Sequence, residues 1–265
     1  MWIDTHCHLD AAEFGTDSAS IAARALQQQV SWIVMPAVDT GNFDTVQRLA
    51  HSQPNCTYAL GIHPMYVPQA DLKDLAHLRA AIPFALDDPR FVAIGEIGLD
   101  FFIPSLCTPE IRAKQEHFYV EQLKIARDFD LPVLLHVRRS QDIILKYLRR
   151  IGIDRGIAHA FNGSDQQAHA FIDLGLRIGL GGAMTFIRAL QIRRLAASLP
   201  LSALVLETDA PDIAPAWVHP ARNSPEQLPA IGAVLAGLRG VTPEVIAAAT
   251  SENARVALPR LALLA

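Results

Sequence analysis

The feature that most constrains the fold of this chain is the alternation of short apolar runs with longer stretches of helical pattern. Most of these runs lack a polar and apolar alternation, which is typical of strands buried on both faces of a parallel sheet. Eight strands that alternate with helices predict a (β/α)8 barrel, and an open, doubly wound sheet is the alternative. The expected strands are Trp2–Thr5, Val30–Val38, Thr57–Ile62, Phe91–Gly95, Pro132–Leu135, Gly156–Ala158, Leu176–Leu180 and Ala203–Leu206.

The intervening segments carry signals for helix starts. Ser164 and Gln167 have the spacing of a capping box. Thr108 and Thr242 are each followed by Pro and Glu, which is typical of an N-cap and the first turn of a helix. Apolar residues recur near helical spacing in Pro109–Phe129, so we expect this helix to pack one face inward.

Composition limits the class of protein. With 265 residues, of which 51% are hydrophobic and 19% charged, we expect one barrel domain over residues 1–265. The net charge of −4 argues against a general electrostatic grip on nucleic acid but allows a local basic patch. Three cysteines without a CxxC spacing indicate a reducing compartment. Because neither a signal peptide nor a membrane-spanning run is found, we expect a cytoplasmic protein without membrane contact.

Half of the ten histidines lie where predicted strands end, which is where barrel enzymes place their chemistry. Residues two apart in extended backbone point to the same face, so the imidazoles of His6 and His8 are expected to converge. Asp4, two residues before His6, lies on the same face. Converging imidazoles suggest a metal. The histidines at strand ends are His6, His8, His63, His136 and His159, whereas His51, His77, His117, His169 and His219 lie in helices or a Pro-rich loop.

Two carboxylates join this set, because Glu96 closes the fourth predicted strand and Asp209 the eighth. A carboxylate leaving an apolar strand is costly to bury without a cation or hydrogen-bond donors. Four histidines and two carboxylates from five strands favour two divalent cations, with Glu96 as the central, shared ligand. An ionic plug at the top of the barrel is the alternative. The ligands expected from the residues are His6, His8, Glu96, His136, His159 and Asp209.

Other residues near the strand ends suggest further roles. Asp209 is placed to orient a water molecule or take its proton, and Glu207 to orient a histidine ligand. Cys7 points away from the ligand face and is expected in the core. The arginines near the strand ends are Arg138, Arg139, Arg188 and Arg222, and a guanidinium at the mouth of a barrel suits a phosphate, with a solvated surface role as the alternative for each. Aromatic residues that could stack on bases or pack beneath the loops are Phe101, Phe102 and Trp217.

Six motifs occur in an order that resembles the TatD family of metal-dependent deoxyribonucleases, and the resemblance covers nearly the whole chain. They are Asp4-Thr5-His6-Cys7-His8, Gly61-Ile62-His63-Pro64, Gly95-Glu96-Ile97-Gly98-Leu99-Asp100, Leu131-Pro132-Val133-Leu134-Leu135-His136-Val137-Arg138, His159-Ala160-Phe161-Asn162-Gly163 and Glu207-Thr208-Asp209-Ala210-Pro211. Arg222-Asn223-Ser224-Pro225 and Asn253-Ala254 extend the match. Small departures at Val137, Ala160, Asn162 and Phe101-Phe102 leave every ligand in place and put only substrate choice in doubt.

The resemblance implies a TIM barrel with a dinuclear metal site. One ion would be bound by His6, His8 and Asp209, the other by His136 and His159, with Glu96 bridging. His63 would be the additional active-site histidine near the substrate phosphate. We therefore expect a phosphodiester hydrolase, in which the catalytic residues are Asp209, Glu96 and His63 and the substrate-binding residues are His63, Arg138 and Arg222.

By the same resemblance, the expected substrate is DNA or a short oligonucleotide, trimmed from 3′ to 5′ at single-stranded ends. We expect the protein to be a monomer, although the sequence does not fix its oligomeric state. A barrel of the amidohydrolase type acting on an ester, lactone or amide is the alternative, but such barrels commonly bridge their metals with a modified lysine where this chain has Glu96. A third alternative is a metal-dependent binding or scaffolding protein without turnover. The ligand set suits Zn, Mn or Fe and keeps Mg possible.

Overall fold

The computed structural model describes residues 1–264 and contains a single eight-stranded sheet whose strands follow one another in chain order. All seven neighbouring pairs are parallel. Each predicted strand is confirmed in place and order. The strands are β1 (Trp2–Asp4), β2 (Val30–Pro36), β3 (Cys56–Leu60), β4 (Phe91–Asp100), β5 (Val133–Arg138), β6 (Gly156–His159), β7 (Arg177–Leu180) and β8 (Leu204–Leu206).

The first and last strands meet, so the sheet closes almost completely on itself. The amide and the hydroxyl of Thr5 both donate to the carbonyl of Leu206, at 3.1 and 3.0 Å. Just above them the amide of Asp209 donates to the carbonyl of His6 at 2.8 Å. The architecture is therefore a (β/α)8 TIM barrel rather than an open sheet.

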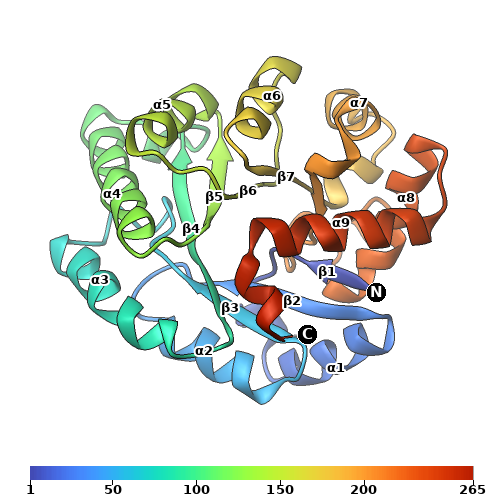
Figure 1. The fold of residues 1–265 in the computed structure, drawn as a ribbon, viewed down its shortest axis with the longest axis horizontal. Coiled ribbons are helices and arrows are strands. Elements are labelled where there is room, and N and C mark those ends of the chain that lie inside the picture. The colour runs from blue at the N-terminus through green and yellow to red at the C-terminus, as the bar shows by residue number, and fades with distance from the viewer. Residues whose placement is uncertain (265) are drawn as a thin grey trace.

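Within the described residues, eight α-helices surround the strands and a ninth crosses one end of the barrel (Figure 1). The capping box at Ser164 and the cap at Thr108 are confirmed, whereas the Thr242 side chain makes no capping hydrogen bond. The helices are α1 (Ser18–Gln27), α2 (Phe43–Ser52), α3 (Leu72–Leu86), α4 (Pro109–Asp128), α5 (Gln141–Ile151), α6 (Asp165–Asp173), α7 (Leu190–Ser198), α8 (Leu228–Arg239) and α9 (Pro243–Ala257).

Among residues 1–264, the two larger of three hydrophobic clusters form most of the core. A large cluster lies between the strands and the surrounding helices and includes the predicted inward face of α4. A smaller cluster contains one or two residues from most of the strands together with α9 and the short 3-10 helix Pro259–Leu264. Asn253 of α9 donates to the carbonyls of Leu201 and Leu204, both at 2.8 Å. Helix α9 therefore seals the end of the barrel opposite the strand C-termini, which leaves the other end for the site.

One strand boundary differs from the prediction in a way that matters for the site. Strand β4 runs to Asp100, so Glu96 lies within the strand and does not close it. Ile94 pairs with Val133 and Ile97 with Leu135, so β4 carries one extra residue next to Glu96. Such a bulge re-aims a side chain. The continuous apolar pattern gave no sign of it.

Among residues 1–264, no single helix has the length and hydrophobicity needed to cross a membrane. Only a helical pair bent by 108°, Pro225–Arg239 with Pro243–Ala257, meets that test by length and composition. The three cysteines are free, and Cys7 is buried as expected. The cytoplasmic location and the assignment of residues 1–265 to one domain stay predictions.

Candidate metal centre

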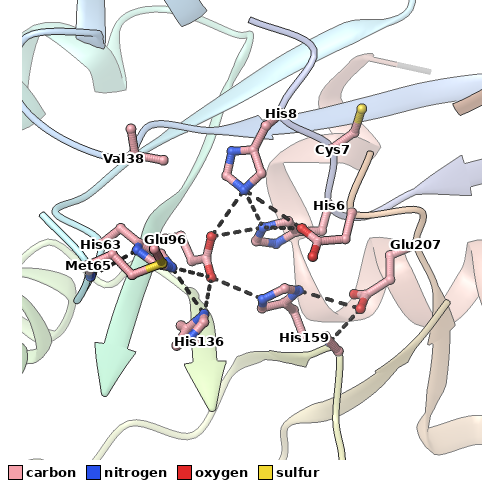
Figure 2. Close-up of polar contacts among 12 residues, drawn as sticks. His6, Cys7, His8, Val38, His63, Met65, Glu96, His136, His159 and Glu207 are labelled. Atoms are coloured by element: carbon pink, nitrogen blue, oxygen red, sulfur yellow. Dashed lines mark hydrogen bonds and ion pairs between the residues drawn. The ribbon is translucent and has the colours of Figure 1, made fainter. Parts of the chain in front are cut away.

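Every histidine predicted for the site reaches one cluster at the C-terminal end of the barrel, around Glu96 (Figure 2). His6 and His8 follow β1, His136 lies within β5, and His159 is the last residue of β6. Glu96 is 1% exposed, so its carboxylate depends on these neighbours and not on water.

One oxygen of Glu96 faces the histidines that follow β1. Its Oε2 lies 3.0 Å from His6 Nε2 and 3.3 Å from His8 Nε2. Oδ1 of Asp209, three residues beyond β8, lies 3.7 Å from the first of these nitrogens and 3.8 Å from the second. These four side chains form the first donor group.

The other oxygen of Glu96 faces three further histidines. Its Oε1 lies 2.9 Å from His136 Nδ1, 3.0 Å from His159 Nε2 and 3.2 Å from His63 Nε2. The imidazoles of His6 and His159 stack with centroids 3.8 Å apart, which brings the two groups together. The carboxylate of Glu96 thus lies between two sets of donors, one at each oxygen.

His63 differs from the other histidines in the contact made by the ring nitrogen that does not face Glu96. Its Nδ1 accepts the amide hydrogen of Met65 at 3.1 Å, so the neutral ring carries its proton on Nε2 and donates there. In contrast, His136 Nε2 lies 3.1 Å from Asp100 Oδ2, and His159 Nδ1 lies 3.5 Å from Glu207 Oε1. Asp100 accepts the ring proton of His136, whereas the Glu207 carboxylate faces His159 Nδ1 without a hydrogen bond. In both rings the opposite nitrogen stays free to bind a cation.

Burial and neighbouring charges shift the pKa values of the groups in the cluster. Burial alone would raise the pKa of Glu96, but the imidazoles around it, those of His63 and His159 first, hold it well below its usual range. Burial raises the pKa of Asp209 to about 6 and lowers that of His63 to about 4. Although burial acts the other way, Glu96 and Asp209 raise the pKa of His8 to about 9. Protons on imidazoles therefore balance the carboxylates, and a cation that binds here would replace them.

The donor spacing fits divalent cations. A tetrahedral cation with bonds of about 2.1 Å keeps neighbouring ligand atoms about 3.4 Å apart. The separations given above span that value, and His6 Nε2 and His8 Nε2 lie 3.3 Å apart. Side chains fall into three sets, and within each set the donor atoms all lie within 4.8 Å of one another. The sets are His6, His8 and Asp209; His6, Glu96 and His159; and His63, Glu96 and His136. Buried ring nitrogens and carboxylates in this arrangement are typical of metal sites.

Two residues without a predicted role support the cluster. Asp100 is buried at the end of β4, where Oδ1 accepts the amides of Phe102 and Ile103 while Oδ2 faces His136. The side chain of Gln122 on α4 is hydrogen bonded to both the amide and the carbonyl of Ile62, next to His63. Asp100 lies in the Gly95–Asp100 motif that the sequence singled out, but neither its position at the end of β4 nor the contact of Gln122 with the distant Ile62 was visible there.

Asp4 does not join the ligands. Its carboxylate accepts the amide and the hydroxyl of Thr208, at 2.9 and 2.6 Å, and also the amide of His6. Asp4 therefore ties the end of β1 to the segment that carries Asp209. Glu207 lies near His159, as expected, and also accepts the amide of Ala160 at 2.5 Å.

The two arginines predicted to bind substrate lie in different surroundings. Nη1 of Arg138 is 3.7 Å from Asp100 Oδ2, so its guanidinium borders the cluster through Asp100 and His136. Arg222 donates to the carbonyl of Glu13 at 2.7 Å and lies over the ring of Phe14, on the loop between β1 and α1. Its role in substrate binding stays a prediction.

Comparison with known proteins identifies the family. A family model described as TatD related DNase matches residues 3–259. The chain belongs to the TatD family. It is 39% identical, over 96% of its length and 97% of the other protein, to an uncharacterized metal-dependent hydrolase of Haemophilus influenzae. It is 32% identical to a Salmonella typhimurium protein named 3'-5' ssDNA/RNA exonuclease TatD, over 95% of this chain and 96% of that one.

A solved structure supports the same assignment. The crystal structure of YJJV, a TatD homologue from Escherichia coli, superposes with a TM-score of 0.90 at 39% identity and covers 97% of this chain and 98% of that one. The predicted family and fold are confirmed, and the chain is a metal-dependent hydrolase of the TatD family.

Proposed function

We propose that this TatD-family hydrolase cleaves phosphodiester bonds in DNA and removes nucleotides from the 3′ ends of single strands, with two divalent cations held on either side of Glu96. The observation that carries the proposal is the position of Glu96, whose Oε2 faces His6 and His8 while its Oε1 faces His136 and His159. With donors at both of its oxygens, this carboxylate would help to hold two divalent cations.

In the proposed site, His6, His8, Asp209 and Glu96 hold one cation, and His136, His159 and Glu96 hold the other. Divalent cations, when bound, supply an acidified water molecule and charge neutralisation for the phosphate. The residues of the chain orient the reactants around them. Asp209, whose Oδ1 lies 3.7 Å from His6 Nε2 and 3.8 Å from His8 Nε2, is placed to orient the attacking water or to accept its proton.

His63 acts on the substrate and not as a ligand. With Nδ1 engaged by the amide of Met65, its Nε2 carries a hydrogen and points into the cluster, where it donates to a phosphate oxygen. The pKa of about 4 keeps this ring neutral at working pH, so it contributes a hydrogen bond without adding a charge.

The choice of substrate rests on relatives. The Salmonella typhimurium protein is named as a 3'-5' ssDNA/RNA exonuclease, which supports a nucleic acid substrate and this direction for the present chain. Four imidazoles and two carboxylates suit Zn, Mn or Fe and keep Mg possible. We expect a monomer with DNA or a short oligonucleotide as its partner.

Hydrolysis of end-labelled single-stranded DNA tests the proposal. Metal-stripped protein is supplied with Mg, Mn or Zn, beside the Glu96→Ala variant and a variant distant from the site, Arg150→Gln. We expect metal-dependent release of nucleotides from the 3′ end by the wild type and Arg150→Gln but not by Glu96→Ala. The proposal is overturned if no metal supports DNA turnover while a lactone or amide panel is hydrolysed.

A further inference from the structure

An exposed aromatic ring beside the cluster is in contact with two guanidinium groups. Phe102, in the loop after β4, is 44% exposed. The guanidinium carbon of Arg138 lies 4.1 Å from its ring centroid, and that of Arg139 lies 4.6 Å away. Both arginines are exposed and follow one another at the end of β5. Cation–π contacts of this kind hold long side chains in one place.

The guanidinium groups of these arginines have few ion-pair partners within the described part of the chain. Within residues 1–264, Arg139 has no ion-pair partner, and Arg138 has only Asp100, at 3.7 Å. That carboxylate is already engaged by His136 and by two backbone amides. Two guanidiniums therefore present free donors to solvent in a chain whose net charge is −4. A planar fork of donors matches a phosphate group.

The backbone around the ring is built to keep this arrangement. The amide of Phe101 donates to the carbonyl of Arg138 at 2.8 Å, and the hydroxyl of Ser140 donates to that of Leu99 at 2.7 Å. These bonds join the loops after β4 and β5. Arg139 has a φ of 55°, in the left-handed region that side chains other than glycine seldom adopt. Unfavourable backbone of this kind is retained mostly at functional sites.

The position of Arg138 relative to the cluster indicates which phosphate it meets. The imidazole of His136 faces Glu96 with Nδ1 and Asp100 with Nε2, and Arg138 lies beyond Asp100. A ring and a carboxylate thus separate the guanidinium from the donors around Glu96. Arg138 is therefore next to the donor cluster but outside it, which is the placement required to meet a phosphate adjacent to one held at the cluster.

We propose that Arg138, Arg139 and Phe102 form a subsite for the phosphodiester next to the scissile one in a single-stranded nucleic acid. The inference rests on the proposed function and adds to it a site that requires a second phosphate in the substrate. Phe102 acts as a positioning residue, because it holds the two guanidiniums without contacting the reacting atoms.

Trinucleotides with and without one neutral linkage test this subsite. A methylphosphonate at the linkage next to the scissile one removes a single negative charge. We expect this change to lower kcat/KM of the metal-loaded wild type about tenfold, since charge-assisted hydrogen bonds are lost. In Arg139→Gln and Arg138→Gln the same change is expected to cost clearly less than tenfold, because one of the two guanidiniums that meet this phosphate is already missing.

The control is Arg150→Gln, which removes an exposed guanidinium that lies over Tyr147 on α5. It should keep the wild-type ratio between the two trinucleotides. The subsite is overturned if the two arginine variants show the same ratio as the wild type while the normal trinucleotide is still cleaved. A wild type that cleaves neither trinucleotide with Mg, Mn or Zn overturns the proposed function and the subsite together.

Discussion

At the scale of single residues, the nitrogen that each imidazole presents decides what the ring can do. His136 and His159 have one nitrogen at Glu96 and the other at a carboxylate, Asp100 or Glu207. A carboxylate behind an imidazole fixes its tautomer and makes it a better ligand. His63, whose Nδ1 accepts an amide hydrogen, is oriented the opposite way and serves as a donor.

Asp100→Asn is expected to weaken cation binding without unfolding the protein. The amide keeps an oxygen for the backbone amides of Phe102 and Ile103 but no longer stabilises the ring proton of His136. We expect metal affinity to fall about 10- to 100-fold, as measured by titration against a chelator. Asp130→Asn, at a carboxylate that is 86% exposed, should leave the affinity unchanged. Equal affinities for Asp100→Asn and the wild type would contradict the positioning role.

The clustering of the candidate ligands could be predicted from the sequence because each lies at or just after the end of a predicted apolar run, and the barrel brings those ends together. Their supporting partners could not be predicted equally well. Gln122 reaches Ile62 across 60 residues from the middle of α4, and no local pattern records such a contact. The tautomer of His63 likewise depends on the amide of Met65, which only the folded loop brings near.

At the scale of secondary-structure elements, β4 differs most from its expected form. Its apolar run predicted a strand that stops before Glu96, but all ten residues from Phe91 to Asp100 are buried and belong to the strand. A continuous apolar run predicts burial, but it does not predict a bulge. The extra residue next to Glu96 is defined only by the register of β4 against β5. The bulge matters because it turns the carboxylate into the cluster.

Helix α9 contributes stability from the end of the barrel that lies away from the site. Leu258, just after this helix, is fully buried against residues of several strands, whereas Val256 is 49% exposed. Leu258→Ala should lower the free energy of unfolding by about 2–5 kcal/mol. Val256→Ala should change it by less than about 0.5 kcal/mol. Chemical denaturation measures both, and a similar small effect of the two substitutions would show that the seal is not part of the core.

At the scale of the whole molecule, the closed end of the barrel is held by a buried carboxylate. Asp88 accepts hydrogen bonds from His51 on α2 at 2.7 Å and from Tyr58 on β3 at 2.9 Å. Arg260, beyond α9, donates to the carbonyl of Asp88 at 2.8 Å. Burial alone would raise the pKa of this carboxyl, but the hydrogen bonds, those from His51 and the Arg90 amide first, lower it.

The lowered pKa of Asp88 predicts a pH dependence of stability. Its ionised form stabilises the fold above the ordinary aspartate pKa of about 3.9, and this contribution is lost as pH falls through the lowered value. Asp88→Asn should therefore lower Tm near neutral pH, and the difference from the wild type should shrink below about pH 4. Thermal unfolding between pH 7 and pH 3, with the exposed Asp87→Asn as control, measures this. A difference that does not vary with pH would exclude the ionised carboxylate as its cause.

The most direct test of the two-cation site is the number of metal ions that each chain binds. Metal-stripped wild-type protein and Glu96→Gln are titrated with Mn, and bound metal is counted per chain after removal of the excess. We expect two ions per chain in the wild type and no more than one in Glu96→Gln, because the amide cannot serve two cations with charged oxygens. One ion per chain in the wild type, or two in Glu96→Gln, would contradict the shared role of Glu96.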